Sequence, residues 1–346
     1  MKHSELSKLS FTGPLPGQAP LLNPSGSIPL PYSSNAFHYW DPWFVSSAEK
    51  LHLFHLQADK RIPALERHHH ASIGHAILGA DGSYLSLPPA LSPDEEVRTI
   101  WTGSSLQSSE GLNLFYTFRR RDENLRQRIG FARSTDSTKF ESLDIDGVVL
   151  PDEKFYKDGS DRNNYGVVPA WRDPFVFFDD KEQCYRMLVT AQDSTVSGQF
   201  DACIGQATSR DLVTWRQSEP LLSPQLFAEM EHPQLIVWNG MFYLLFSCKG
   251  EYCSFSGQQE LRFSQPFCYV SDSSRGPFLP IRGQGLINSL PEDVFGIRVL
   301  ACSEDYLLVV GWLSGREDES FIGEITSPFL IRRESESLIY EPLERH

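Results

Sequence analysis

The sequence lacks long apolar runs and has a deficit of positive charge. No segment reaches the roughly 18 consecutive apolar residues of a membrane-spanning helix, and residues 1–8 lack the apolar core of a signal peptide. Acidic residues outnumber lysine and arginine by 45 to 31, which gives a net charge of −14. Such a charge disfavours nucleic acid and anionic membranes as partners. We therefore expect a cytoplasmic protein that binds neither.

Several common functional motifs are also missing. The six cysteines show no Cys-x-x-Cys spacing, so we expect reduced structural thiols. Neither a glycine-rich phosphate loop nor Gly-x-Ser-x-Gly occurs, which removes support for a serine esterase. Neighbouring histidines at 68–70 would point to opposite faces of a strand and could not all ligate one ion. We expect no metal and no cofactor.

What the sequence does contain is a repeated pair of apolar runs. In each copy, an acidic residue or its neighbouring proline precedes a short apolar run, and a turn leads to a second, aromatic-rich run. The clear copies begin at Asp41, Asp173, Glu231 and Asp293, and a weaker copy begins at Trp101. Repeats of tens of residues built from strand pairs are typical of a β-propeller. The sequence therefore predicts an all-β fold, a single five-bladed β-propeller.

The repeats also divide the chain. Residues 1–36 are rich in proline, glycine and serine and should form an extended N-terminal lead-in. Residues 37–330 should form the five-bladed catalytic domain, and residues 331–346 a C-terminal tail. Long loops are expected at 59–70 and 151–169, and loops of this length in a compact domain are usually functional or disordered. They could form the walls of a substrate pocket.

Three acidic residues occupy corresponding places in the repeats. Asp41 and Asp173 each precede a proline and lie beside tryptophan, and Glu231 occupies the third place. A single Asp-Pro is often only a turn cap, but the repeated context favours a functional role. A propeller would bring the three side chains together at its axis. Converging carboxylates suit glycoside hydrolysis, in which one attacks or activates water and another protonates the leaving oxygen.

Tryptophans accompany these acids in the sequence. Trp40, Trp43, Trp101 and Trp171 all fall near them in the repeat frame. Because sugar rings present apolar C–H faces, aromatic side chains often form the walls of carbohydrate pockets. We expect at least one of the four to belong to the core instead.

The ordered set of residues resembles the five-bladed β-propeller glycoside hydrolases of families 32 and 68 and, more distantly, family 43. The resemblance covers most of residues 37–330. It implies that Asp41 is the nucleophile and Glu231 the acid/base, while Asp173, in an Arg-Asp-Pro motif, stabilises the transition state. It also implies that Arg172 supports Asp173.

Different segments match the two families. The segments similar to family 68, the levansucrases, are Trp40-Asp41-x-Trp43, Trp101-Thr102-Gly103-Ser104 and Glu229-x-Glu231. Those similar to family 32, the invertases, are Gly74-His75-Ala76 and Trp171-Arg172-Asp173-Pro174. Lys249 lies where family 68 has a sugar-binding arginine. The chain departs from family 32 in having Glu-His-Pro at 231–233 in place of Glu-Cys-Pro. Since only 16 residues of the sequence follow residue 330, we expect no β-sandwich there.

The resemblance implies retaining cleavage of a β-fructofuranoside such as sucrose, with a small sugar as the partner. The predicted substrate-binding residues are Trp40, Trp43, His75, Trp101, Thr102, Arg172, Glu229 and Lys249. Three alternatives remain open: a levansucrase-like fructosyltransferase, a family 43-like inverting arabinosidase or xylosidase, and a sugar-binding propeller without catalysis.

Overall fold

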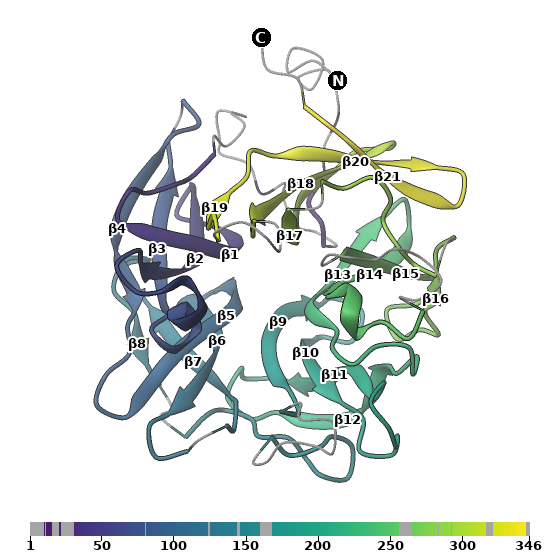
Figure 1. Ribbon diagram of the computed structural model, residues 1–346, viewed down its shortest axis with the longest axis horizontal. Helices are drawn as coiled ribbons and strands as arrows, with labels where there is room; N and C mark the ends of the chain where they lie inside the picture. The colour runs from purple at the N-terminus through teal and green to yellow at the C-terminus, as the bar shows by residue number, and fades with distance from the viewer. Residues whose placement is uncertain are drawn as a thin grey trace.

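Five antiparallel sheets surround a central axis in the computed structural model of the chain (Figure 1). The structure describes residues 10, 12–15, 21, 31–79, 81–123, 125–143, 146–159, 168–255, 265–282, 284–291, 293–315 and 321–343. Each sheet is one blade, and the first strand of each blade lies nearest the axis. The fifth blade closes the ring. The predicted five-bladed β-propeller is confirmed.

Each blade is built from strands that follow one another along the chain. Blade 1 contains β1 (Phe37–Ser47), β2 (Lys50–Asp59), β3 (Ser72–Leu78) and β4 (Tyr84–Leu91). Blade 2 contains β5 (Val97–Ser108), β6 (Gly111–Arg120), β7 (Arg128–Ser134) and β8 (Glu141–Ser142). Blade 3 contains β9 (Trp171–Asp179), β10 (Cys184–Gln192), β11 (Ala202–Ser209) and β12 (Arg216–Leu222).

The last two blades complete the ring. Blade 4 contains β13 (Glu231–Trp238), β14 (Met241–Cys248), β15 (Gln265–Ser271) and β16 (Leu279–Pro280). Blade 5 contains β17 (Val294–Cys302), β18 (Tyr306–Leu313), β19 (Glu324–Ile325), β20 (Phe329–Glu334) and β21 (Ser337–Glu341). The predicted propeller boundary at residue 330 therefore lies inside β20, because blade 5 needs β20 and β21 as its outer strands.

Two short 3₁₀ helices lie within the described ranges, and neither they nor any other described helix could cross a membrane. The first, η1 (Ala64–His69), replaces much of the loop expected at 59–70, and the second is η2 (Gly250–Tyr252). Residues 160–167 of the other expected loop lie outside the described residues. All six cysteines are free thiols, and five of them are buried, as the sequence predicted.

The core consists of apolar clusters that join neighbouring blades. One cluster joins blades 1 and 2 through Phe54 and Phe118, and another joins blades 5 and 1 through Leu308 and Leu53. Full burial of one such side chain contributes about 1.5–3 kcal/mol. The lead-in reinforces the closure, because Tyr32 forms a β-bridge with Ile325 at the same junction. Most of residues 1–30 lie outside the described part of the chain.

Candidate active site

The first strand of every blade carries a β-bulge at the same level of the propeller. At each bulge the pairing register with the second strand shifts, so two residues lie opposite one. The bulged pairs, in blade order, are Asp41-Pro42, Thr102-Gly103, Asp173-Pro174, His232-Pro233 and Gly296-Ile297. Because the bulges re-aim the side chains beside the axis, they determine which groups meet there.

The backbone at four of the five bulges is left-handed. The φ angle is 48° at Asp41, 58° at Asp173, 55° at His232 and 60° at Gly296. Aspartate and histidine are enriched among the few non-glycine residues that adopt positive φ. Proline follows the first three, and a bulge on an inner edge strand suits a residue that donates no hydrogen bond. The local sequence therefore favours the bulge itself.

A cavity of about 430 Å³ opens at the axis above these bulges. Its lining combines charged residues from the inner strands with aromatic and polar residues from blade 2, η1 and η2. The lining residues are Asp41, Leu56, Leu65, His68, His69, Trp101, Arg119, Gln127, Val168, Arg172, Asp173, Glu229, Glu231, His232, Lys249 and Tyr252. The predicted catalytic residues Asp41, Asp173 and Glu231 thus share one cavity.

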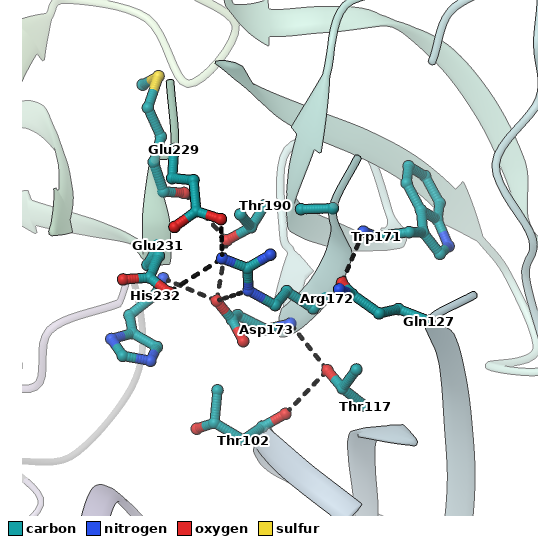
Figure 2. A network of polar contacts seen from close by, with 12 residues as sticks. Thr102, Thr117, Gln127, Trp171, Arg172, Asp173, Thr190, Glu229, Glu231 and His232 are labelled. Atoms are coloured by element: carbon teal, nitrogen blue, oxygen red, sulfur yellow. Dashed lines mark hydrogen bonds and ion pairs between the residues drawn. The ribbon is translucent and has the colours of Figure 1, made fainter. Parts of the chain in front are cut away.

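Arg172 lies at the centre of the charged groups (Figure 2). Its Nη2 is 2.9 Å from Oε1 of Glu231 and 3.1 Å from Oε1 of Glu229, and its Nε is 3.6 Å from Oδ2 of Asp173. Burial opposes the charge on Arg172, but the three carboxylates outweigh it and raise the pKa of the guanidinium. Arg172 is therefore a permanent cation that holds Glu229 and Glu231 side by side.

Asp173 is fixed by neighbours from three blades. Its backbone N–H donates to Oγ1 of Thr117 at 2.9 Å, and that hydroxyl in turn donates to the carbonyl of Thr102 (Figure 2). Its Oδ2 accepts from Oγ1 of Thr190 at 3.0 Å and from the backbone N–H of His232 at 3.2 Å. Burial raises the pKa of Asp173, while His232 and Arg172 oppose that rise.

Asp41 faces His232 across the axis. Its Oδ2 is 3.3 Å from Nε2 of His232, and both side chains are buried. The other carboxylate oxygen, Oδ1, has no hydrogen-bond partner among the described residues. Asp41 therefore has one oxygen beside an imidazole and one that is buried and has no partner among the described residues.

The two glutamates respond oppositely to the same environment. Burial raises the pKa of Glu229, and this effect exceeds the opposing charge of Arg172. Burial also disfavours ionised Glu231, but Arg172, with His232 and Lys249, outweighs it and lowers the pKa of Glu231 to about 2. Since both bind one guanidinium nitrogen, they titrate as a pair, and a proton taken up by the pair resides more readily on Glu229.

The structure divides the predicted tryptophans between cavity and core. Trp101 lines the cavity, with Nε1 donating to the carbonyl of His68 at 2.7 Å. Trp40 and Trp43 are buried in the cluster between blades 1 and 2, and Trp171 is buried between blades 2 and 3. Trp40 and Trp43, which were predicted to bind substrate, therefore lie outside the cavity lining, because the bulge turns Asp41 rather than its neighbours toward the cavity.

Two other predicted substrate-binding residues lie outside the cavity lining. His75 is on the third strand of blade 1, where its Nε2 is 2.9 Å from Nδ1 of His52 and its ring stacks on Phe54. Thr102 is buried at the blade 2 bulge, and its carbonyl accepts from Thr117. His75 is a core residue, and Thr102 supports Asp173 through Thr117. By contrast, Glu229, Arg172 and Lys249 line the cavity as predicted.

Sequence reasoning missed several cavity residues, above all His232. The repeats were aligned on acids, which placed Glu231 in register with Asp41 and Asp173. The bulges show that His232 is their counterpart, while Glu231 corresponds to Arg172 one residue earlier. Alignment on the prolines that follow the bulges would have found it. Arg119, Gln127 and Tyr252 had no such signal, since strand ends and η2 bring them to the cavity.

The two 3₁₀ helices that border the cavity are attached to neighbouring blades. The carbonyl of His68 in η1 accepts from Thr99 of β5 as well as from Trp101. The backbone carbonyl of Tyr252, at the end of η2, accepts a hydrogen bond from the backbone N–H of Ala228, the residue directly before Glu229. Within the described ranges, no group of three or more histidine, cysteine, aspartate or glutamate side chains is arranged to hold a metal ion.

Comparison with known families identifies the propeller. The model of the glycosyl hydrolases family 32 N-terminal domain matches residues 44–237, more than half of the chain. The chain belongs to glycosyl hydrolase family 32. This family 32 protein is thus a glycoside hydrolase, and the match includes Asp173, Glu231 and the strands that carry them.

Known proteins similar to this family 32 chain share its architecture. The extracellular sucrase of Zymomonas mobilis is 26% identical over 313 residues, which cover 80% of this chain and 72% of that protein. The inulosucrase from Halalkalicoccus jeotgali bound to kestose superposes with a TM-score of 0.76 at 20% identity, covering 99% of this chain and 95% of the other. A Bacillus subtilis levansucrase in complex with oligosaccharides gives 0.72 at 16% identity, covering 90% and 88%.

The sucrase comparison corrects one expectation. Its two matching representatives, from two Zymomonas mobilis strains, are both named extracellular. That name contradicts the cytoplasmic location expected from the sequence. The expectation depended on the absence of an apolar segment at residues 1–8, which does not determine location.

Proposed function

We propose that this family 32 protein is a retaining β-fructofuranosidase that cleaves sucrose or a related β-fructoside. The observation that carries the proposal is the meeting of Asp41, Asp173 and Glu231 in one cavity, with Arg172 between the last two. The name of the Zymomonas mobilis relative supports sucrose as the substrate. The kestose and oligosaccharides named with the structural neighbours support a fructoside-binding cavity.

In the first step, Oδ1 of Asp41 attacks the anomeric carbon of the fructosyl unit. A carbon–oxygen bond to Asp41 forms as the glycosidic bond breaks, and Glu231 gives its proton to the leaving oxygen. In the second step, Glu231 takes a proton from water, whose oxygen displaces Asp41 from the anomeric carbon. Both carboxyl groups return to their starting states, so the reaction needs no other reactant.

Asp173 supports the positively charged transition state. Its carboxylate is held by Thr190 and by the N–H of His232, so it need not reorganise when charge develops on the fructosyl ring. Arg172 prevents the neighbouring negative charges from driving Asp173 out of position. This interaction strengthens as the glycosidic bond breaks, and it therefore contributes to turnover more than to initial binding.

The proton for the leaving group comes from the Glu229–Glu231 pair. Without substrate, Arg172 keeps Glu231 ionised and Glu229 is the more readily protonated member. A substrate oxygen beside Glu231 favours transfer of the shared proton to Glu231, because only the protonated carboxyl can donate a hydrogen bond to it.

The upper wall of the cavity is suited to the rest of the sugar. Trp101 and Tyr252 offer aromatic faces for sugar C–H groups, and Lys249 and Arg119 offer donors for hydroxyl groups. Lys249 Nζ lies 5.6 Å from the centre of the Tyr252 ring, so the two belong to one contact surface. We assign these residues to substrate binding.

Fructosyl transfer is the second candidate function. It is favoured by the extent of overlap with an inulosucrase and a levansucrase, whose names denote transfer chemistry. The first step would be identical, and a sugar hydroxyl would replace water in the second.

Separate measurement of glucose and fructose released from sucrose tests both functions. Equal amounts support hydrolysis, whereas less fructose than glucose supports transfer. Early NMR spectra should show β-fructofuranose before it equilibrates. Initial α-product would contradict a covalent Asp41 intermediate, and failure to cleave any β-fructoside would overturn the proposed function.

A further inference from the structure

His232 occupies the third charged position in the ring of bulges. It stands on β13 where Asp41 stands on β1 and Asp173 on β9, with the same left-handed backbone and a proline after it. Two of the three equivalent positions thus carry carboxylates, and the third carries an imidazole directed at one of them. The proposed function assigns roles to the carboxylates but leaves the imidazole without one.

Packing fixes the imidazole from every side. On the blade 5 side its ring contacts Phe295, with centroids 5.5 Å apart, and Arg298 donates to its backbone carbonyl at 3.3 Å. Gly296 lies next to the ring, and a Cβ there would touch Nδ1 of His232 at 3.4 Å and clash with Nε1 of Trp312 at 2.7 Å. On the blade 3 side its N–H binds Asp173. The two backbone contacts hold the main chain of His232 in place, and the ring itself cannot turn far without displacing its contact with Phe295.

The two nitrogens of the His232 ring have very different surroundings. Nε2 has Oδ2 of Asp41 at 3.3 Å, whereas Nδ1 is buried without a hydrogen-bond partner among the described residues. The charged groups around it are Asp41 on β1, Asp173 on β9, Glu231 on its own strand and Arg298 on β17. The guanidinium of Arg298 is directed at the backbone carbonyl, and that of Arg172 pairs with Asp173 and Glu231. Asp41 beside Nε2, together with the other two carboxylates, therefore favours a positively charged imidazole.

We propose that positively charged His232 is the positioning residue of the nucleophile: it binds Oδ2 of Asp41 and so directs Oδ1 at the anomeric carbon. The inference rests on the proposed function. Without this contact, the Asp41 carboxylate could rotate about its Cβ–Cγ bond and lose the attack geometry. A positively charged imidazole attracts the Asp41 carboxylate more strongly than a neutral one and therefore restricts that rotation more effectively.

The contact makes turnover depend on pH. Burial lowers the pKa of His232, but Asp41, Asp173 and Glu231 outweigh burial and raise it above the ordinary value of 6.5. The charged form therefore persists through neutral pH and is lost as pH rises through the raised value. Activity should fall with it on the alkaline side.

Two substitutions separate orientation from charge. In His232→Asn the side chain tolerates the left-handed backbone but is too short to reach the Nε2 position. We expect kcat to fall about 100-fold with a small change in KM, since misplacement of a reacting group by about 1 Å can cost that much. In His232→Gln the amide can donate from near the Nε2 position without charge, and we expect partial recovery of kcat.

The pH profile should be measured on an activated aryl β-fructoside. Its leaving group needs no protonation, so the requirement for protonated Glu231 does not contribute an alkaline limb. Wild type should still lose activity as pH rises above the pKa of His232, while His232→Gln should show a flat profile. His75→Asn, a change to a buried histidine outside the cavity lining, is the matched control and should keep the wild-type profile. A flat wild-type profile, or an unchanged one in His232→Gln, would overturn the inference.

An NMR titration tests the contact between His232 and Asp41 without a measurement of turnover. The imidazole signal of His232, assigned by its loss in His232→Gln, should titrate above pH 6.5 in wild type and shift to lower pH in Asp41→Asn. An imidazole that is neutral throughout, or unaffected by Asp41→Asn, would contradict the inference. If the titration behaves as expected but no β-fructoside is cleaved, the contact stands and the proposed function fails.

Discussion

The floor and the rim of the cavity are built in different ways. The floor, consisting of Asp41, Asp173 and His232, is buried and carried by left-handed bulges on three inner strands. The rim, which includes Leu65 and Tyr252, comes mainly from η1, η2 and strand ends, with Trp101 bordering it from the inner strand β5, and Leu65 is 88% exposed. On the floor, the backbone determines where each group points. At the rim, the groups that reach the cavity are side chains carried by short elements.

This difference indicates how the two regions should respond to substitution. Each floor group binds another floor group or a neighbouring strand, so replacing one alters the charge and geometry of the others. Rim residues contact the cavity from separate elements and can be replaced more independently. We therefore expect floor substitutions to act mainly on kcat and rim substitutions mainly on KM.

The largest effect is expected for Asp41→Asn. The amide cannot form the covalent bond to the anomeric carbon, and loss of a catalytic nucleophile can cost on the order of 10⁴-fold or more in kcat. Steady-state rates on sucrose and circular dichroism of the folded protein would check this. A variant that folds and retains more than about a tenth of wild-type turnover would show that Asp41 is not the nucleophile.

Glu231→Gln should follow, with a loss of about 10²–10⁴-fold on sucrose and a much smaller loss on an activated aryl fructoside. The reaction requires protonated Glu231, so activity on sucrose falls as pH rises and the Glu229–Glu231 pair loses its proton. That part of the alkaline limb should disappear in Glu231→Gln. The exposed Glu251 on η2 provides a control, because Glu251→Gln removes a nearby charge and should leave the profile unchanged. Equal losses on both substrates would instead indicate a structural role.

The core of blade 1 provides a contrast to the floor of the cavity, because there a histidine, His55, is buried without a carboxylate partner. Burial lowers the pKa of His55 from 6.5 to about 4, whereas the carboxylates of the floor raise that of His232. A lowered pKa in the folded state means that the unfolded chain takes up the proton first as pH falls. The free energy of unfolding should therefore decrease by about 2 kcal/mol from this residue between pH 7 and pH 5.

Urea unfolding at the two pH values would measure that loss. A neutral replacement such as His55→Gln should reduce the difference in unfolding free energy between the two pH values, even if it lowers stability at both. An unchanged difference would show that His55 does not contribute to acid sensitivity.

The smallest effect is expected at the rim. Trp101→Ala should raise KM for sucrose about fivefold with little change in kcat, because an aromatic contact to substrate contributes roughly 1 kcal/mol. Trp215 lies outside the cavity lining, with Nε1 donating to Leu212, so Trp215→Ala is a suitable control. A fall in kcat without a change in KM would place Trp101 with the floor instead.

The sequence predicted the fold and the three acids, because strand pairs and their turns recur at regular intervals. It did not predict the exact repeat frame. A β-bulge inserts one residue into a strand and reverses which neighbours face the axis. Alignment of the repeats on their acids therefore placed Glu231 where His232 stands, and only the prolines carry the correct register. The same reversal placed Trp40 in the core beside an Asp41 that faces the cavity.

The positions of other residues could not be predicted from local sequence patterns. His75 was selected for its motif, but the third strand of a blade lies away from the axis, and only the assembled sheet reveals that. Tyr252 and Arg119 reach the cavity through contacts between segments far apart in sequence. Their positions depend on packing between blades rather than on any pattern within one.

The ring of bulges also explains how a repetitive scaffold can hold an asymmetric reaction centre. Five copies of one backbone unit would, with identical side chains, place five identical groups around the axis. Here the five positions carry aspartate, threonine, aspartate, histidine and glycine. The backbone retains approximate rotational symmetry while the sequence of side chains has none, so a chiral sugar would meet a different arrangement of groups from each direction.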